Sequence, residues 1–210
     1  IKLDLEIVIK KEIPVSAGLG GGSSDAASAI LAVNKMFSLG VSFDRLLAVA
    51  SSTGKDVPFF MLKECFAIGR GSGEILEPLD IRCSLAHIIV KPKISFSTAE
   101  MYRILDKCRR GSRKRYGIEG VVKAVKKGDI DLLKTKCYNI FDEALPFGKR
   151  SIIEEAKTLL QTAGAGPGFL SGSGPSVYCI VKDTKEAMGI VRKMPKVKNM
   201  DIFVAETWKG

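Results

Sequence analysis

The chain is organised around its most glycine-rich stretch, Pro14-Val15-Ser16-Ala17-Gly18-Leu19-Gly20-Gly21-Gly22-Ser23-Ser24-Asp25. Four of the five residues from position 18 to position 22 are glycine. Glycine inside a helix or strand costs roughly 0.5–1 kcal/mol relative to alanine, so such a cluster indicates that the backbone itself is needed. Without Cβ atoms, the chain can adopt positive φ values, and a ligand can approach its N–H groups closely.

The residues after this loop predict a helix that opens at Ser23 with a serine as its N-cap. A glycine loop that leads into a helix N-terminus favours anions, because unpaired N–H groups and the positive end of the helix dipole point the same way. The loop is not a Walker loop, since no Gly-Lys-Ser/Thr closes it, and it fits the dinucleotide-binding fingerprint poorly. We therefore predict phosphate binding, with a glycine-rich turn that binds no ligand as the alternative.

Two later segments carry further candidate functional residues. Gly54-Lys55-Asp56-Val57-Pro58-Phe59-Phe60 presents a carboxylate, Asp56, at a predicted loop end. Pro58 predicts an extended Val57, and the two phenylalanines that follow are expected to anchor the segment in the core. From the residues alone, Asp56 suits a general base and an ordinary turn aspartate equally well. Leu170-Ser171-Gly172-Ser173-Gly174-Pro175-Ser176 is a second glycine-rich turn.

These three segments resemble the motifs of the GHMP kinases, the superfamily of galactokinase, homoserine kinase, mevalonate kinase and phosphomevalonate kinase. Residues 14–27 resemble its ATP-phosphate loop, residues 54–60 its catalytic-aspartate segment, and residues 170–176 its third, glycine-rich motif. Within the superfamily, residues 18–27 are most similar to the 4-diphosphocytidyl-2-C-methyl-D-erythritol kinases of the non-mevalonate isoprenoid pathway. The three motifs occur in the family's order and extend over most of the chain.

The resemblance implies a kinase that uses ATP and Mg²⁺ to phosphorylate the 2-hydroxyl of 4-diphosphocytidyl-2-C-methyl-D-erythritol, a small molecule that carries a cytidine diphosphate group. Asp56 is then the catalytic residue that accepts the hydroxyl proton. Ser23 or Ser24 lies near Mg²⁺, with Ser24 as the metal ligand. The implied substrate-binding residues are Tyr102, beside the cytosine ring, and Gly172, Ser173 and Gly174. The implied ATP-binding residues are Pro14, Val15, Ser16, Ala17, Gly18, Leu19, Gly20, Gly21, Gly22, Ser23 and Ser24.

The implied fold is α+β, in the two-domain arrangement of the GHMP kinases. Residues 1–82 correspond to a ribosomal protein S5 domain 2-like, ATP-binding domain, and residues 83–210 to a ferredoxin-like C-terminal domain. Residue patterns agree with this class, since alternation at Lys2–Lys10 predicts a half-buried strand and a capping box at Ser97–Glu100 predicts a helix start. Further strands are predicted at 64–70, 74–79, 85–91, 177–181 and 201–208, and helices at 43–52, 97–105, 118–127, 129–137, 152–163 and 184–193.

Two features depart from the family pattern. The family begins with a lysine-bearing strand, Ala-Lys-Ile/Leu-Asn-Leu, and an Asp-Gly-Tyr-His segment that contacts the nucleotide part of the substrate. The sequence contains neither, so we expect an N-terminally incomplete chain. In the glycine turn Gly69–Glu74, Ser72 stands where the resemblance implies arginine. Another GHMP kinase, of the homoserine or mevalonate type, and a non-catalytic RNA-binding protein of the same fold are the alternatives.

Composition narrows the class of protein further. The 210 residues are 46% hydrophobic, which indicates a globular chain, and no apolar run reaches the ~20 residues that span a membrane. Five scattered cysteines without a C-x-x-C pair argue against a disulfide framework or a zinc site and predict a cytoplasmic protein, and the single histidine, His87, is expected in the core.

The formal net charge of +10 is concentrated in a basic tract, residues 103–115. Few aromatic side chains interleave with its arginines and lysines, and it contains no nucleic-acid recognition motif. We predict a solvated surface loop without a specific nucleic-acid partner. Attraction of anionic substrates and adventitious binding of nucleic acid are the alternatives.

Overall fold

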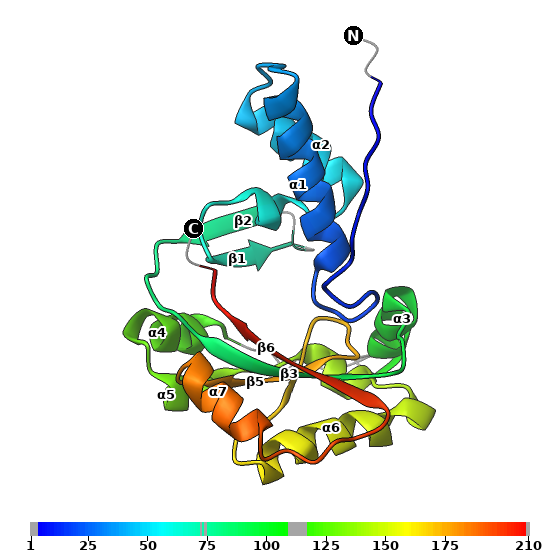
Figure 1. Ribbon diagram of the computed structural model, residues 1–210, viewed down its shortest axis with the longest axis vertical. Helices are drawn as coiled ribbons and strands as arrows, with labels where there is room; N and C mark the ends of the chain where they lie inside the picture. Colours follow the sequence, from blue (N-terminus) through cyan, green and yellow to red (C-terminus); the bar gives the residue numbers. More distant parts are fainter. Residues whose placement is uncertain (1–3, 72, 74, 109–116, 209–210) are drawn as a thin grey trace. The chain divides into compact units, whose positions relative to one another are not determined.

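The computed structural model describes residues 4–71, 73, 75–108 and 117–208 (Figure 1). The chain forms two compact units, of which the first comprises Ile1–Val15 and Gly20–Leu79 and the second comprises Ser16–Leu19 and Asp80–Gly210. Both units combine helices with antiparallel strands, so the predicted α+β class is confirmed. The assignment of residues 1–82 and 83–210 to two kinase domains stays a prediction.

The first unit is built on two helices and a short 3₁₀-helix. The helix α1 spans Gly21–Met36, α2 spans Phe43–Thr53, and the 3₁₀-helix η1 spans Pro58–Met61. Their small core consists of Ala27, Leu46, Ala50, Val57 and Met61, with Phe60 packed against it. A hairpin of β1, Phe66–Arg70, and β2, Ile75–Leu79, completes the unit.

Three expectations for this unit are wrong. Residues 4–10 form no strand in the described chain and are exposed, because alternating side chains give a strand only where another strand offers backbone hydrogen bonds. The helix α1 begins at Gly21, and the left-handed Gly20 (φ 68°) occupies the N-cap position. No serine therefore caps it, and the Ser24 hydroxyl instead donates to the Gly21 carbonyl at 2.9 Å.

The third error concerns the residue before Pro58. Val57 is helical, with φ −61° and ψ −42°, and not extended. Its N–H donates to the Gly54 carbonyl at 3.1 Å and closes a turn that leads directly into η1. This hydrogen bond and the burial of the Val57 side chain outweigh the steric preference of a residue before proline.

The second unit contains a four-stranded antiparallel sheet in the order β4-β5-β3-β6. Two helices, α6 and α7, pack against one face of this sheet (Figure 1). On that face, Ile88 of β3 lies opposite Cys179 of β5 and is fully buried. The strands are β3 Ala86–Pro92, β4 Phe169–Leu170, β5 Val177–Val181 and β6 Met200–Glu206, and the two helices are α6 Arg150–Thr162 and α7 Thr184–Val191.

The remaining helices of the second unit also follow the predicted pattern. Ser97 caps α3, since its hydroxyl oxygen accepts the Glu100 N–H at 3.4 Å. Gly128, with φ 62°, ends α4. Ser72 and residues 109–115 of the basic tract lie outside the described residues, so the expectations for them stay predictions. The helices are α3 Thr98–Cys108, α4 Glu119–Lys127, α5 Ile130–Lys136, and the 3₁₀-helices η2 Ile140–Ala144 and η3 Phe147–Lys149.

Candidate functional site

Two of the predicted motifs meet within the second unit. The Ser171 hydroxyl donates to the Gly18 carbonyl at 2.8 Å, across 153 positions of sequence. The Ser176 N–H donates to the Ala17 carbonyl at 3.2 Å. Gly18 has φ 72°, and a Cβ on it would lie only 2.2 Å from the Ser171 carbonyl oxygen. Glycine is required at position 18 because the backbone of the third motif occupies the space of a side chain.

The third motif holds its own shape by backbone hydrogen bonds. The Gly174 N–H donates to the Ser171 carbonyl at 2.7 Å, and the Ser171 N–H donates to the Ser176 carbonyl at 2.8 Å. Gly172 and Gly174 both have positive φ values, 51° and 81°. The Ser173 hydroxyl lies 3.0 Å from the Thr98 hydroxyl, which connects the loop to the first turn of α3. The structure thus places Gly172, Ser173 and Gly174 together with Ala17 and Gly18.

A polar side chain that sequence reasoning missed supports this loop from its other side. Asn139 donates from its Nδ2 atom to the carbonyls of Leu170, at 2.7 Å, and Gly172, at 2.9 Å. Its Oδ1 atom accepts the Phe141 N–H at 2.9 Å. The partners lie 31 and 33 positions away, so no local pattern distinguishes Asn139 from any other asparagine.

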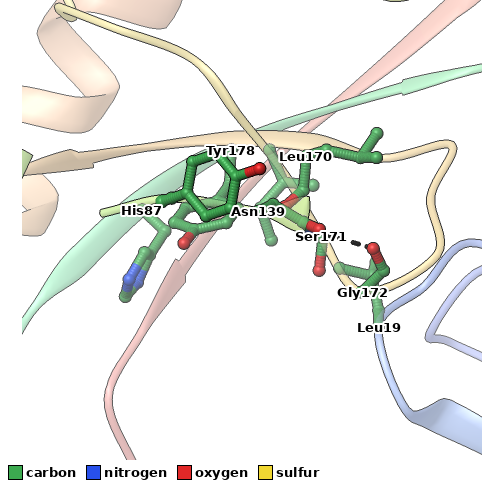
Figure 2. Close-up of a pocket in the computed structure, with 9 residues that line it drawn as sticks. Leu19, His87, Asn139, Leu170, Ser171, Gly172 and Tyr178 are labelled. Atoms are coloured by element: carbon green, nitrogen blue, oxygen red, sulfur yellow. Dashed lines mark hydrogen bonds between the residues drawn. The ribbon is translucent and has the colours of Figure 1, made fainter. Parts of the chain in front are cut away.

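Beside the third motif, the second unit has a pocket of about 420 Å³ (Figure 2). His87 and Tyr178 contact each other edge to face on its wall, with ring centroids 5.8 Å apart. Burial lowers the pKa of His87 below 6.5, so its imidazole is neutral at pH 7. Burial and the nearby Cys137 raise the pKa of Tyr178. His87 is therefore a pocket residue and not the core residue that the sequence predicts. The pocket is lined by Leu19, His87, Ile89, Tyr138, Asn139, Leu170, Ser171, Gly172 and Tyr178.

Within the first unit, the second half of the glycine segment forms the start of α1. Gly20, with φ 68°, lies under the Phe60 ring, and a Cβ on it would come 2.6 Å from the ring's Cζ atom. The first N–H groups of a helix lack partners inside it, so those of Gly21, Gly22 and Ser23 can bind an anion. A Cβ on Gly22 would meet no atom within 4 Å, which leaves space for a ligand there.

A lysine that sequence reasoning missed lies beside this helix start. The Lys11 ammonium pairs with the Asp25 carboxylate and lies 3.5 Å from the place of a Cβ on Gly21. A Walker loop places its lysine after the glycines, whereas this lysine precedes them. The ion pair also balances the charge of Asp25, which would otherwise repel a phosphate at the helix start.

Asp56 lies in the same unit as this helix start. It is exposed, in the turn that the Val57 N–H closes on Gly54. This turn continues into η1, which packs on α1 and carries Phe60 against Gly20. The described residues contain no group of three His, Cys, Asp or Glu side chains that could bind a metal ion. None of the helices in the described part of the chain has the length and apolarity needed to cross a membrane.

Comparison with known proteins identifies the family. Residues 2–64 match the GHMP kinases N terminal domain, and residues 121–199 match the GHMP kinases C terminal domain. A 4-diphosphocytidyl-2-C-methyl-D-erythritol kinase of Alkaliphilus metalliredigens is 40% identical over 183 residues, which cover 87% of this chain and 62% of that protein. The kinase of the same name from Geobacter metallireducens is 36% identical over 97% of this chain and 69% of its own length.

Solved structures agree with the sequence matches. The crystal structure of a 4-(cytidine 5'-diphospho)-2C-methyl-D-erythritol kinase superposes with a TM-score of 0.74 at 25% identity, over 96% of this chain and 70% of that one. A homoserine kinase from Cytophaga hutchinsonii has the same fold, with a TM-score of 0.70 at 20% identity over 94% of this chain and 68% of its own. The chain belongs to the GHMP kinases, among the relatives named 4-diphosphocytidyl-2-C-methyl-D-erythritol kinase.

Proposed function

We propose that the protein transfers the γ-phosphoryl group of ATP to the 2-hydroxyl of 4-diphosphocytidyl-2-C-methyl-D-erythritol. The observation that carries the proposal is its 40% and 36% identity to two kinases of that name, over 87% and 97% of the chain. The aligned regions span 62% and 69% of those relatives' lengths. The five scattered cysteines, without a C-x-x-C pair, agree with a reducing location, for which we propose the cytoplasm.

ATP binding is assigned to the start of α1. The N–H groups of Gly21, Gly22 and Ser23 would donate hydrogen bonds to phosphate oxygens, and the dipole of a 16-residue helix adds to this attraction. The Lys11 ammonium pairs with Asp25 at the same end of the helix, so the two side chains together present no net negative charge to a phosphate. Gly18 and Gly20 contribute by allowing the loop to turn, since protein atoms already occupy the space that a Cβ would need at both positions.

Ser24 suits the predicted role of Mg²⁺ ligand. Its hydroxyl proton points to the Gly21 carbonyl, so lone pairs of the hydroxyl oxygen remain for a cation. Mg²⁺ in kinases is held by few protein groups together with the substrate's phosphates, which agrees with the lack of an all-protein cluster among the described residues. Bound there, Mg²⁺ would neutralise charge on the transferred phosphoryl group.

Asp56 is assigned as the group that accepts the proton of the acceptor hydroxyl. The turn that contains Asp56 is followed directly by η1, which packs on α1. The backbone of Asp56 is therefore held in place within the first unit. Tyr102 is assigned to the cytosine. Tyr102 is 52% exposed, and its ring is supported edge to face by Phe141 at 5.0 Å, so the residue is open to contact with a base.

The assignment of Asp56 is tested by Asp56→Asn, with Asp44→Asn as the matched control at an exposed helix residue. General-base action typically contributes 10²–10⁴-fold, so the kcat of Asp56→Asn should fall by about that factor while ATP affinity is kept. Asp44→Asn should keep the parental kcat. A folded Asp56→Asn protein that binds ATP and turns over at the parental rate would contradict the role of Asp56.

The homoserine kinase fold match favours one other candidate activity, phosphorylation of homoserine. Cytidine diphosphate shares the nucleotide part of the proposed substrate and should compete with it for the site. Homoserine should not compete, because it carries no base for Tyr102. The two activities are separated by measuring inhibition by cytidine diphosphate and direct turnover of homoserine with the same protein sample.

A further inference from the structure

We propose that Asn139 is a positioning residue that couples the third glycine motif to the aromatic support of Tyr102. The inference deepens the proposed kinase function and rests on it. It assigns to one side chain the task of keeping the third-motif loop and Tyr102 in a fixed relation within the second unit.

The carboxamide of Asn139 forms hydrogen bonds through both its NH₂ group and its oxygen. Both Nδ2 hydrogens are donated to the loop, at 2.7 Å to Leu170 and 2.9 Å to Gly172. The Oδ1 atom accepts the Phe141 N–H at 2.9 Å. A flipped amide would place its oxygen against two carbonyl oxygens and its NH₂ group against an N–H donor, so only one orientation satisfies the site.

On the acceptor side, the contact continues to Tyr102. Phe141 is the second residue of η2, and its N–H is fixed by Asn139. The Phe141 ring meets the Tyr102 ring at a centroid distance of 5.0 Å and an interplanar angle of 83°. A shift of Asn139 would therefore move the surface on which Tyr102 rests.

The loop that accepts the Asn139 donors also contacts α3, the helix that carries Tyr102. Gly172 precedes Ser173, whose hydroxyl lies 3.0 Å from that of Thr98 at the start of α3. Tyr102 lies one turn further along α3. These contacts thus form a closed ring, which runs through Asn139, Gly172, Ser173, Thr98, Tyr102 and Phe141. In such a ring the loop and the tyrosine cannot move independently without breaking at least one contact.

Asn139→Asp separates the two halves of this role. The carboxylate has the shape of the amide and still accepts the Phe141 N–H, but it has no proton to donate to Leu170 and Gly172. Its negative charge would face two carbonyl oxygens, whose dipoles disfavour the charged form. Protonation then restores one O–H donor, so the lost loop contact returns in part as the pH is lowered.

In kinetic terms, kcat/KM for the cytidine-bearing substrate should fall at least tenfold in Asn139→Asp at pH 8, because the third motif that Asn139 holds carries the assigned substrate-binding residues. It should recover severalfold between pH 8 and pH 6, relative to the unaltered protein at each pH. Asn139→Ala removes the donors and the acceptor together. It should therefore raise the KM for the cytidine-bearing substrate as well, and it should show no recovery at low pH.

The matched control is Asn34→Asp. Asn34 makes the same kind of contact in the first unit, where it donates to the Val41 carbonyl at 3.4 Å and accepts the Val41 N–H at 3.1 Å. This substitution should lower thermal stability without a pH-dependent change in kcat/KM. Equal pH recovery in both variants would overturn the proposal, because the effect would then be a general one of a new carboxylate.

A measurement without turnover separates this proposal from the kinase assignment. In NMR spectra of the Asn139→Asp protein, the amide signals of Gly172 and Phe141 should titrate together with the new carboxylate. Failure of the unaltered protein to phosphorylate its substrate would count against the proposed function alone. Parental kinetics at every pH in Asn139→Asp, or a Gly172 signal that does not titrate, would overturn the coupling role.

Discussion

The segment from Ser16 to Ser24 contains glycine in both of its halves, Ser16–Leu19 and Gly20–Ser24, but the two halves need it for different reasons. In the first half, Gly18 faces the protein's own backbone, and a Cβ there would lie 2.2 Å from the Ser171 carbonyl oxygen and 2.9 Å from that of Gly174. In the second half, Gly22 faces open space, with no atom within 4 Å of its Cβ position. The fold requires the first glycine, whereas the second leaves room for a ligand.

This difference changes how a glycine-rich loop is interpreted. From the sequence, every glycine of the loop is expected to allow ligand approach or a positive φ. Gly18 has a positive φ, but its decisive neighbour is another loop of the same chain. Gly22 lies in a helix, where alanine would give higher stability than glycine. A glycine at this position therefore lowers helix stability, and the empty space beside it is useful only if a ligand binds there. Substitutions in the two halves should therefore have opposite effects on stability.

The largest effect is expected for Gly18→Ala. The new methyl group overlaps a backbone oxygen that cannot move without breaking the third motif, so the unfolding free energy should fall by roughly 3 kcal/mol or more. Gly40→Ala is the matched control, because Gly40 has a similar φ of 64° and no atom within 4 Å of its Cβ position. It should lose only about 1 kcal/mol, the cost of left-handed geometry. Equal losses in chemical denaturation would show that the contact with Ser171 is unimportant.

A smaller loss is expected for Ser171→Ala, which removes the hydroxyl that donates to Gly18 at 2.8 Å. A single intramolecular hydrogen bond contributes about 1 kcal/mol, and this one is only partly buried, so the loss of unfolding free energy should be about that size. Ser51→Ala, which removes an exposed hydroxyl bond to Leu47 within α2, serves as the control and should change little. If both variants are equally stable, the connection between the two loops carries no energy.

Gly22→Ala should have the opposite sign. Alanine favours the helix by up to about 1 kcal/mol over glycine, so thermal stability should rise. ATP affinity should fall in the same protein, because the methyl group would fill the space left for phosphate. Higher stability with unchanged affinity, measured by calorimetric titration, would place the phosphates elsewhere. Gly21 is less informative, since a Cβ there would already lie 2.8 Å from Ile13.

The smallest expected effect is a pH dependence of the unfolding free energy. It concerns the second unit, which contains both Ser16–Leu19 and His87. The pKa of His87, the chain's single histidine, is lowered by burial, so the unfolded chain takes up its proton more readily. The stabilisation is complete above pH 6.5 and is lost as the pH falls from there toward the folded-state pKa. Denaturation at pH 7.5 and pH 5.5 should show a smaller decline in His87→Gln than in the unaltered protein. An identical decline would exclude His87 as its source.

How much the sequence reveals depends on how far apart the interacting residues lie. The strand at 85–91 is predictable because it is a short, mostly apolar run, and the helix at 43–52 because Leu46 and Ala50 recur on one face. The errors at residues 4–10 and at Val57 arise where backbone hydrogen bonds, or their lack, override local preference. The motifs themselves are visible in sequence, but their contacts are not. No local sequence pattern indicates the hydrogen bond from Ser171 to Gly18 or the one from Asn139 to Gly172.

The passage of the chain between its units has a consequence for inheritance. Ser16–Leu19 belongs to the second unit although the residues on either side belong to the first, so the chain changes unit after positions 15, 19 and 79. A crossover at codon 80 between genes for two relatives would therefore pair one parent's residues 16–19 with the other parent's residues 171–176. In such a hybrid, the Gly18 carbonyl of one parent would have to accept the Ser171 hydroxyl of the other. Position 18 would also have to lack a side chain, because the other parent's loop fills that space. These two short segments, far apart in the gene, are expected to be exchanged successfully only together.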